Sequence, residues 1–149
     1  GSVGGAQAFI RSLKAETNLY GMRRGKEMSI KALATLAGNF LRSNWTVFLI
    51  SPILGGVDKE GNQVYSLDIG GAVMLDNYVA TGSGMQLAYG VLEDKYEEGM
   101  TNKEASSVAA QAIKSASQRD AASGDGIYLS VITEEGVDIQ GFKDFKGLI

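Results

Sequence analysis

Helical and extended patterns occupy separate blocks of this sequence, and that segregation restricts the fold more than any other feature. The patterns predict two helices, three or four strands, two more helices and a final hairpin, over residues 5–24, 29–43, 47–57, 63–69, 72–75, 78–81, 85–96, 101–119, 127–133 and 137–142. Separate runs of helices and strands favour α+β layers with antiparallel pairing over alternating βαβ units.

The clearest helical pattern follows Ser29, whose hydroxyl can cap a helix. Apolar residues then recur with the spacing of one helix face: Ile30, Leu33, Ala34, Ala37, Phe40 and Leu41. Mostly apolar residues with a high β-branched content follow at 47–57, and they predict a strand in which Pro52 favours a bulge or an edge. Turn-forming residues at 58–62 predict that this strand returns as a hairpin.

The second pair of helices ends with a well-marked element. Thr101 and Glu104 have the spacing of a capping box, in which the side chain of each residue accepts a hydrogen bond from the backbone N–H of the other. The helix that they start is expected to pack with an unusually small apolar face, made of Ala105, Val108, Ala109, Ala112, Ile113 and Ala116. Small side chains let a helix lie close to the layer that it covers.

The 149 residues include neither histidine nor cysteine, which limits the available chemistry. A Ser-His-Asp triad, a disulfide framework and thiolate catalysis are excluded, so any catalysis must use hydroxyl, amine or carboxylate groups or backbone amides. With 44% hydrophobic residues and a formal net charge of −3, we expect one globular domain without a nucleic-acid partner. The absence of a long apolar run and of a signal-peptide pattern predicts a cytoplasmic protein without a membrane partner.

Two polar, glycine-rich junctions are candidate sites. Thr81-Gly82-Ser83-Gly84 lies between an extended segment and a helix, where it forms either a tight turn or an anion site. It is not a dinucleotide fingerprint, because Leu87 stands where the third glycine belongs. Asp120 and Ser123 follow a helix end, where they either approach one group in a cleft or form local turns. Spacing alone does not separate these alternatives.

Taken together, the motifs resemble those of one family in order and spacing. The resemblance covers nearly the whole chain and lies in residues 15–16, 19–20, 54–58, 65–68, 78–84, 88–94, 118–120 and 123–127. These motifs resemble archaeal-type proteasome β subunits, which belong to the N-terminal nucleophile hydrolases. The resemblance implies a four-layer αββα sandwich, in agreement with the α+β prediction.

The resemblance also implies a threonine endopeptidase that degrades unfolded polypeptides without a cofactor or a metal. In this family the hydroxyl of an N-terminal threonine attacks the substrate, and the threonine's own amine activates that hydroxyl. By position, Ser83, Asp120 and Ser123 would surround and orient the amine. Gly1 would supply the oxyanion amide, and Val3 would line the substrate side-chain pocket.

The sequence departs from the family pattern in several places. It begins after the expected threonine, lysine and aspartate, so we expect a single β-type domain over 1–149 that is incomplete at its N-terminus, lacks the first strands and is inactive alone. It also ends early, soon after Phe145. Gly5 replaces the usual acidic residue, and residues 43–52 differ from the family's tyrosine- and proline-bearing stretch.

Three functional hypotheses remain open. The first is a catalytic β subunit, with other β subunits in a heptameric ring, α subunits and a regulatory ATPase as partners. The second is a structural β-type subunit that assembles but does not cleave. The third sets the resemblance aside and predicts an anion- or nucleotide-binding module that uses Gly82–Gly84.

Overall fold

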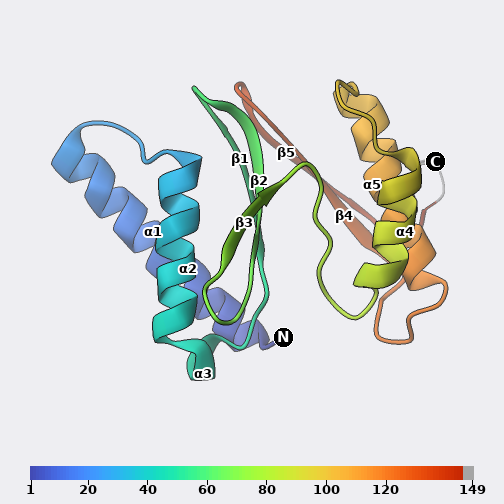
Figure 1. Cartoon of the computed structure of the whole chain (residues 1–149), viewed down its shortest axis with the longest axis horizontal. Helices are drawn as coiled ribbons and strands as arrows, with labels where there is room; N and C mark the ends of the chain where they lie inside the picture. The colour runs from blue at the N-terminus through green and yellow to red at the C-terminus, as the bar shows by residue number, and fades with distance from the viewer. Residues whose placement is uncertain (146–149) are drawn as a thin grey trace. The chain divides into compact units, whose positions relative to one another are not determined.

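The computed structural model describes residues 1–145, except for the side chains of Trp45 and Val47. Helices and strands follow in blocks (Figure 1): α1 (Val3–Arg24), α2 (Ile30–Ser43), α3 (Trp45–Phe48), β1 (Ile53–Asp58), β2 (Gly61–Leu67), β3 (Val73–Asp76), α4 (Met85–Lys95), α5 (Asn102–Ser117), β4 (Ile127–Thr133) and β5 (Gly136–Phe142). They form two compact units, residues 1–79 and the residues from Ala80 onward, which are described separately. The observed α+β class confirms the fold class predicted from the sequence.

The first unit packs helices against a three-stranded antiparallel sheet with the order β1-β2-β3. The central strand β2 sets the register, because Tyr65 lies opposite Leu54 on one side and Leu75 on the other. Helix α2 covers this sheet and contacts all three strands. The core of this unit also draws on α1 and α3, and it consists of Phe9, Ala37, Leu41, Phe48 and Leu67.

Helix α2 forms as its sequence pattern predicts. The Ser29 hydroxyl accepts a hydrogen bond from the Ala32 backbone N–H at 3.2 Å, which satisfies one of the open donors of the first turn. The apolar stripe turns inward, and the fully buried Leu41 lies on it. Gly38 lies so close to the sheet that a Cβ there would stand 2.6 Å from Val73 and 2.8 Å from the Gly71 carbonyl oxygen. The helix therefore packs against the sheet partly through backbone.

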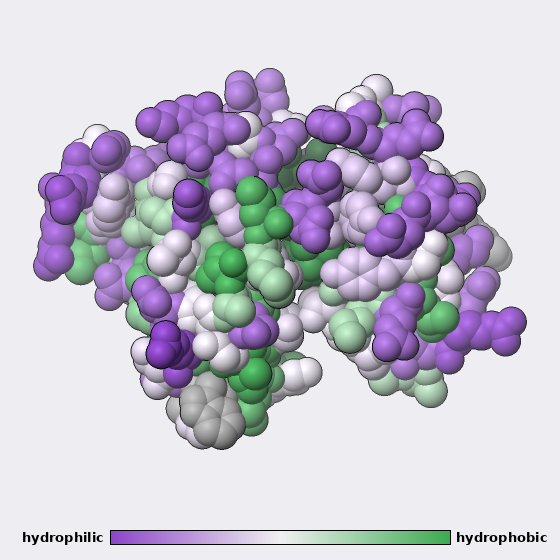
Figure 2. Space-filling model, viewed as in Figure 1, coloured by the Kyte–Doolittle hydropathy of each residue, from purple (hydrophilic) through white to green (hydrophobic). Residues whose placement is uncertain are grey.

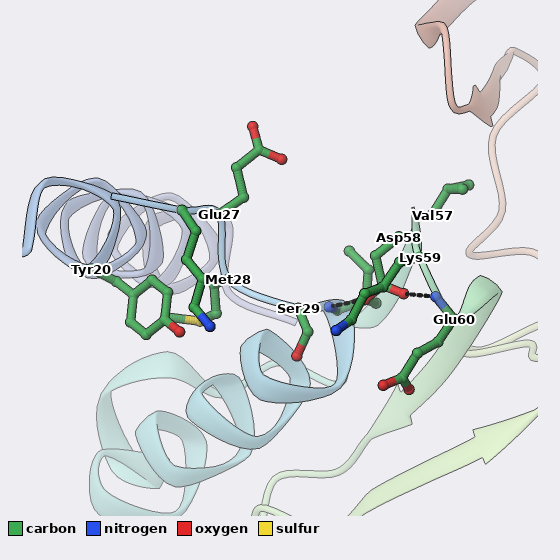
Figure 3. A pocket seen from close by; sticks show the side chains of 10 residues that line it. Tyr20, Glu27, Met28, Ser29, Val57, Asp58, Lys59 and Glu60 are labelled. Carbon is green, nitrogen blue, oxygen red and sulfur yellow. Dashed lines mark hydrogen bonds between the residues drawn. The ribbon is translucent and has the colours of Figure 1, made fainter. Parts of the chain in front are cut away.

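A carboxylate joins the β1–β2 hairpin to the start of α2. Asp58 accepts hydrogen bonds from the backbone N–H groups of Ile30 and Glu60, both at 2.8 Å, and from the Gln63 side-chain amide at 2.9 Å. Figure 3 shows Asp58 between Ser29 and Glu60, beside a pocket of about 520 Å³. The hydrogen bond from Ile30, and then the one from Glu60, lower the pKa of Asp58. The hairpin thus supplies an N-terminal cap for a helix that is distant in sequence.

We predict that Asp58→Asn lowers the melting temperature of the full-length protein, because the Ile30 and Glu60 N–H groups donate to different carboxylate oxygens and the amide nitrogen that replaces one of these oxygens cannot accept a hydrogen bond. Since folding lowers the pKa of Asp58, its stabilisation is present above the unfolded pKa of about 4 and is lost as pH falls through the folded value. The difference from wild type should therefore shrink in melts recorded below about pH 4. Glu60→Gln removes a charge from the same hairpin and should have little effect. Equal melting shifts for both variants would contradict the assigned role.

The second unit packs two helices and a two-stranded sheet. The predicted capping box of α5 is confirmed: Thr101 Oγ1 accepts from the Glu104 N–H at 3.3 Å, and the Glu104 carboxylate accepts from the Thr101 N–H at 2.9 Å. Helices α4 and α5 pack together, and α5 also contacts β4. Strands β4 and β5 form the predicted hairpin, in which Thr133 lies opposite Gly136.

Two predictions of local structure were wrong in part. Residues 45–48 form the short helix α3, and the strand expected from residue 47 begins only at Ile53, after Pro52. The backbone at Leu49 is left-handed, with φ at 47°, and this ends α3 and prevents a continuous strand. On α5, Val108, Ala112 and Ala116 of the predicted face are buried, and Ala110 is buried with them, whereas Ala105, Ala109 and Ile113 lie exposed.

Polar side chains cover much of the visible surface, with apolar side chains exposed among them (Figure 2). Over the sheet of the first unit, Met74 and Leu75 of the edge strand β3 are exposed. Within residues 1–145, no helix combines the length and the apolar character needed to cross a membrane.

Candidate active site

The structure brings Ser83, Asp120 and Ser123 together in the second unit. One oxygen of the Asp120 carboxylate, Oδ2, accepts hydrogen bonds from both hydroxyls, at 2.5 Å from Ser83 Oγ and 2.7 Å from Ser123 Oγ. Ser83 is exposed, and the other two side chains are half-buried. The sequence placed these residues at two separate junctions, and the fold joins them in one surface-accessible cluster.

Two glycines allow this junction to form. Gly82 has φ at 99°, a conformation that residues with a Cβ rarely adopt, and its carbonyl accepts the Met85 N–H that opens α4. Gly84 is buried where α4 meets the end of α5: a Cβ there would stand 2.8 Å from the Ala116 Cβ, 3.3 Å from Ser123 Oγ and 3.4 Å from Asp120 Oδ2. Sequence reasoning treated Gly84 as part of a turn and missed its packing role.

The loop after α5 holds the carboxylate from the other side. The Asp120 N–H donates to the Ala116 carbonyl at 2.8 Å, which keeps residue 120 attached to the last turn of the helix. The Ser123 N–H then donates to the Asp120 carbonyl at 3.1 Å, and the Ala122 N–H donates to Asp120 Oδ1 at 3.3 Å. The two local turns allowed by the sequence are therefore present, and they also aim Asp120 and Ser123 at Ser83.

These contacts favour a negative charge on the cluster. Hydrogen bonds from the Ser123 hydroxyl, and then from the Ser83 hydroxyl, lower the pKa of Asp120 because they favour its ionised form. Each hydroxyl donates its one O–H hydrogen bond to this carboxylate. The hydroxyl oxygens keep lone pairs that can accept further hydrogen bonds. The cluster can therefore receive a cationic or neutral amine, whereas the Asp120 charge disfavours an anion at Ser83.

The two remaining candidates, Gly1 and Val3, belong to the first unit. Ser2 caps α1 by accepting the Gly5 N–H at 3.1 Å, and Val3 is the first residue of the helix, with 74% of its surface exposed. Gly1 lies against residues 49–50, and a Cβ on it would stand 2.8 Å from the Leu49 carbonyl oxygen. The role of both residues remains a prediction from the resemblance.

Comparisons with known proteins agree with the motif resemblance. A family model described as "Proteasome subunit" matches residues 1–132. Proteasome subunit beta 1 of Haloterrigena turkmenica is 66% identical over 149 residues, which cover 100% of this chain and 61% of that protein. Proteasome subunit beta of Natrialba magadii is 61% identical, and that of Halobacterium salinarum is 56% identical, each with 100% of this chain and 61% of the relative covered.

Because the family model matches most of the sequence, the chain belongs to the proteasome subunit family. Within that family, it is similar to archaeal β subunits. The chain spans about three-fifths of the length of the curated relatives that it matches.

We predict that Gly84→Ala opens the cluster, because the added Cβ would meet the rigid Ala116 Cβ and push the start of α4 from the end of α5. Peptides that contain Ser83 and residues 118–123 should then exchange backbone hydrogens faster, which mass spectrometry measures. Gly90→Ala is the matched control within α4, since a Cβ there meets nothing within 4 Å. That change should be neutral or favour the helix by up to about 1 kcal/mol. Unchanged exchange in Gly84→Ala would contradict the close packing.

Proposed function

We propose that the chain is part of a catalytic β subunit of the 20S proteasome, a threonine endopeptidase that degrades unfolded proteins. The observation that carries this proposal is the Ser83–Asp120–Ser123 cluster, in which one carboxylate orders two hydroxyls at an exposed junction. Such a cluster suits an amine, and the family's nucleophile is a threonine that carries a free amine. The chemistry also agrees with a sequence that lacks histidine and cysteine.

In the proposed mechanism, the cluster orients the amine of the N-terminal threonine rather than attacking the substrate itself. Two of the oxygens of Ser83, Ser123 and Asp120 would accept the two N–H groups of this amine and fix its position beside the threonine hydroxyl, which leaves its lone pair free to act as the base. The amine then removes the hydroxyl proton as the oxygen attacks the peptide carbonyl. Because Asp120 remains ionised at neutral pH, it also stabilises the protonated amine that results.

Gly1 and Val3 have separate proposed roles. The Gly1 amide would donate to the oxyanion that forms when the carbonyl is attacked, which is where a fixed donor contributes most to catalysis. Val3, exposed at the start of α1, would line the pocket for the substrate side chain. Both roles rest on position within the family pattern.

The same family membership supports the proposed partners. We propose a single β-type domain that assembles with other β subunits in a heptameric ring and with α subunits in the cytoplasm. A regulatory ATPase would supply unfolded polypeptide.

The decisive experiment uses the assembled full-length protein and a fluorogenic peptide. Asp120→Asn and Ser83→Ala should each lower turnover by at least about 10-fold, because general-base catalysis contributes about 10²–10⁴-fold and its base would lose an orienting partner. Asp125→Asn is the matched control, since it removes an exposed carboxylate further along the same loop. Size-exclusion chromatography should show that all three variants assemble.

Two results would contradict the proposal. If Asp120→Asn and Ser83→Ala turn over the peptide as wild type does, the cluster does not serve the nucleophile. If the assembled wild-type protein cleaves no peptide at all, the chain belongs to a structural β-type subunit instead.

A further inference from the structure

The first turn of α1 is held against the segment that follows α2. The Ser2 backbone N–H donates a hydrogen bond to the Leu49 carbonyl at 3.2 Å. A Cβ on Gly1 would stand 2.8 Å from the same carbonyl oxygen and 3.3 Å from Ile50 Cγ2. The Leu49 carbonyl therefore fixes the peptide unit between residues 1 and 2 by one hydrogen bond and one close contact.

One helical turn further on, Gly5 makes a second contact with this segment. A Cβ on Gly5 would overlap the Phe48 carbonyl oxygen and stand 2.8 Å from the Phe48 carbonyl carbon. The Phe48 ring also packs edge-on against Phe9 of α1, with the ring centroids 5.4 Å apart. Gly5 and residues 43–52, two places where the sequence departs from the family pattern, are thus in direct contact.

The backbone at Leu49 is arranged to make these contacts. Leu49 has φ at 47° and ψ at 46°, and it is the non-glycine residue with positive φ within the described part of the chain. This left-handed conformation is unfavourable for residues with a Cβ. Half of the Leu49 side chain is exposed, so side-chain burial does not explain the conformation. Its direct structural result is the carbonyl aimed at Ser2.

From these contacts, we propose that Leu49 and Gly5 are positioning residues for the oxyanion amide at Gly1. Residues 48–50 contact both ends of the segment from Gly1 to Gly5 and so fix its position. The Leu49 carbonyl contacts residues 1 and 2, and the Phe48 backbone contacts Gly5. The inference rests on the proposed function, because it requires the Gly1 amide to act on the substrate. It adds that the contacts fix the peptide unit directly after Gly1, and with it the Gly1 Cα to which this amide nitrogen is bonded.

The physical reason is preorganisation. A donor stabilises an oxyanion only when it lies at hydrogen-bond distance from the oxygen in the transition state, and displacement by about 1 Å can cost about 100-fold in rate. An element that fixes the donor acts on kcat more than on KM, because the oxyanion exists only after the substrate is bound and attacked.

The test is a pair of alanine variants in one helical turn of the assembled full-length protein. Gly5→Ala forces the added Cβ against the Phe48 carbonyl, so the turn and residues 48–50 must separate. We expect kcat per assembled particle to fall at least about 10-fold, with KM within about twofold of wild type. Gly4→Ala is the matched control, because a Cβ there meets nothing within 4 Å, and it should keep wild-type kcat.

A second pair tests Leu49 without touching α1. Leu49→Ile keeps the side-chain volume but adds a branched Cβ that resists the left-handed conformation, whereas Leu49→Gly favours this conformation. If the backbone conformation matters, kcat of Leu49→Gly exceeds that of Leu49→Ile. If the leucine side chain matters instead, the order is reversed. This pair decides the question if Gly5→Ala does not assemble.

A peptide boronate forms a tetrahedral adduct that resembles the transition state. Its inhibition constant therefore reports on stabilisation of the oxyanion, which a purely structural role of Gly5 would leave unchanged. Its inhibition constant should rise in Gly5→Ala by about the same factor as kcat/KM falls. Wild-type kcat per assembled particle in both Gly5→Ala and Leu49→Ile would overturn the inference while leaving the proposed function intact, provided that Ser83→Ala is impaired. Absence of peptide cleavage by wild type would overturn both.

Discussion

Close packing at glycines that leave no room for a Cβ is the constraint on which both units depend. Gly38 lets α2 lie against the turn between β2 and β3, and Gly5 lets α1 lie against α3. In the second unit, Gly84 lets the start of α4 touch the end of α5. Each position lacks room for a Cβ, so the contacts are specific to glycine in a way that ordinary apolar packing is not.

At Gly84 this constraint has a chemical result. Without the close contact, Ser83 would not reach Asp120, and the carboxylate would keep only the partners of its own loop. With it, three oxygen-bearing side chains from two junctions share one hydrogen-bonded arrangement. A chain without histidine or cysteine thereby gains a polar cluster suited to hold an amine, as the family's chemistry requires.

Much of this architecture could be predicted from the sequence. The spacing of apolar residues and the capping residues located α2 and α5, and the turn-forming residues located both hairpins. These signals lie within a few positions of each other in the sequence. The motif order also indicated the family and the three residues of the cluster. The sequence did not reveal α3, because residues 47–57 carry a strand-like composition and a left-handed Leu49 leaves no local signal.

Long-range contacts were also beyond local reasoning. The cap that Asp58 provides for α2, the packing of Gly84 and the contact of Gly5 with Phe48 all join residues that are distant in sequence. The exposed positions Ala105 and Ala109 were misassigned for the same reason, since a face made mainly of alanines does not show which side meets a neighbour. Such features require knowledge of which elements meet.

The most direct test of the central claim is a crystal structure of the assembled full-length protein with a bound peptide boronate. The account predicts boron bonded to the hydroxyl of an N-terminal threonine, with the threonine amine within about 3.2 Å of oxygens from Ser83, Ser123 or Asp120. A boron atom bonded elsewhere, or a threonine amine that contacts none of these three residues, would contradict it.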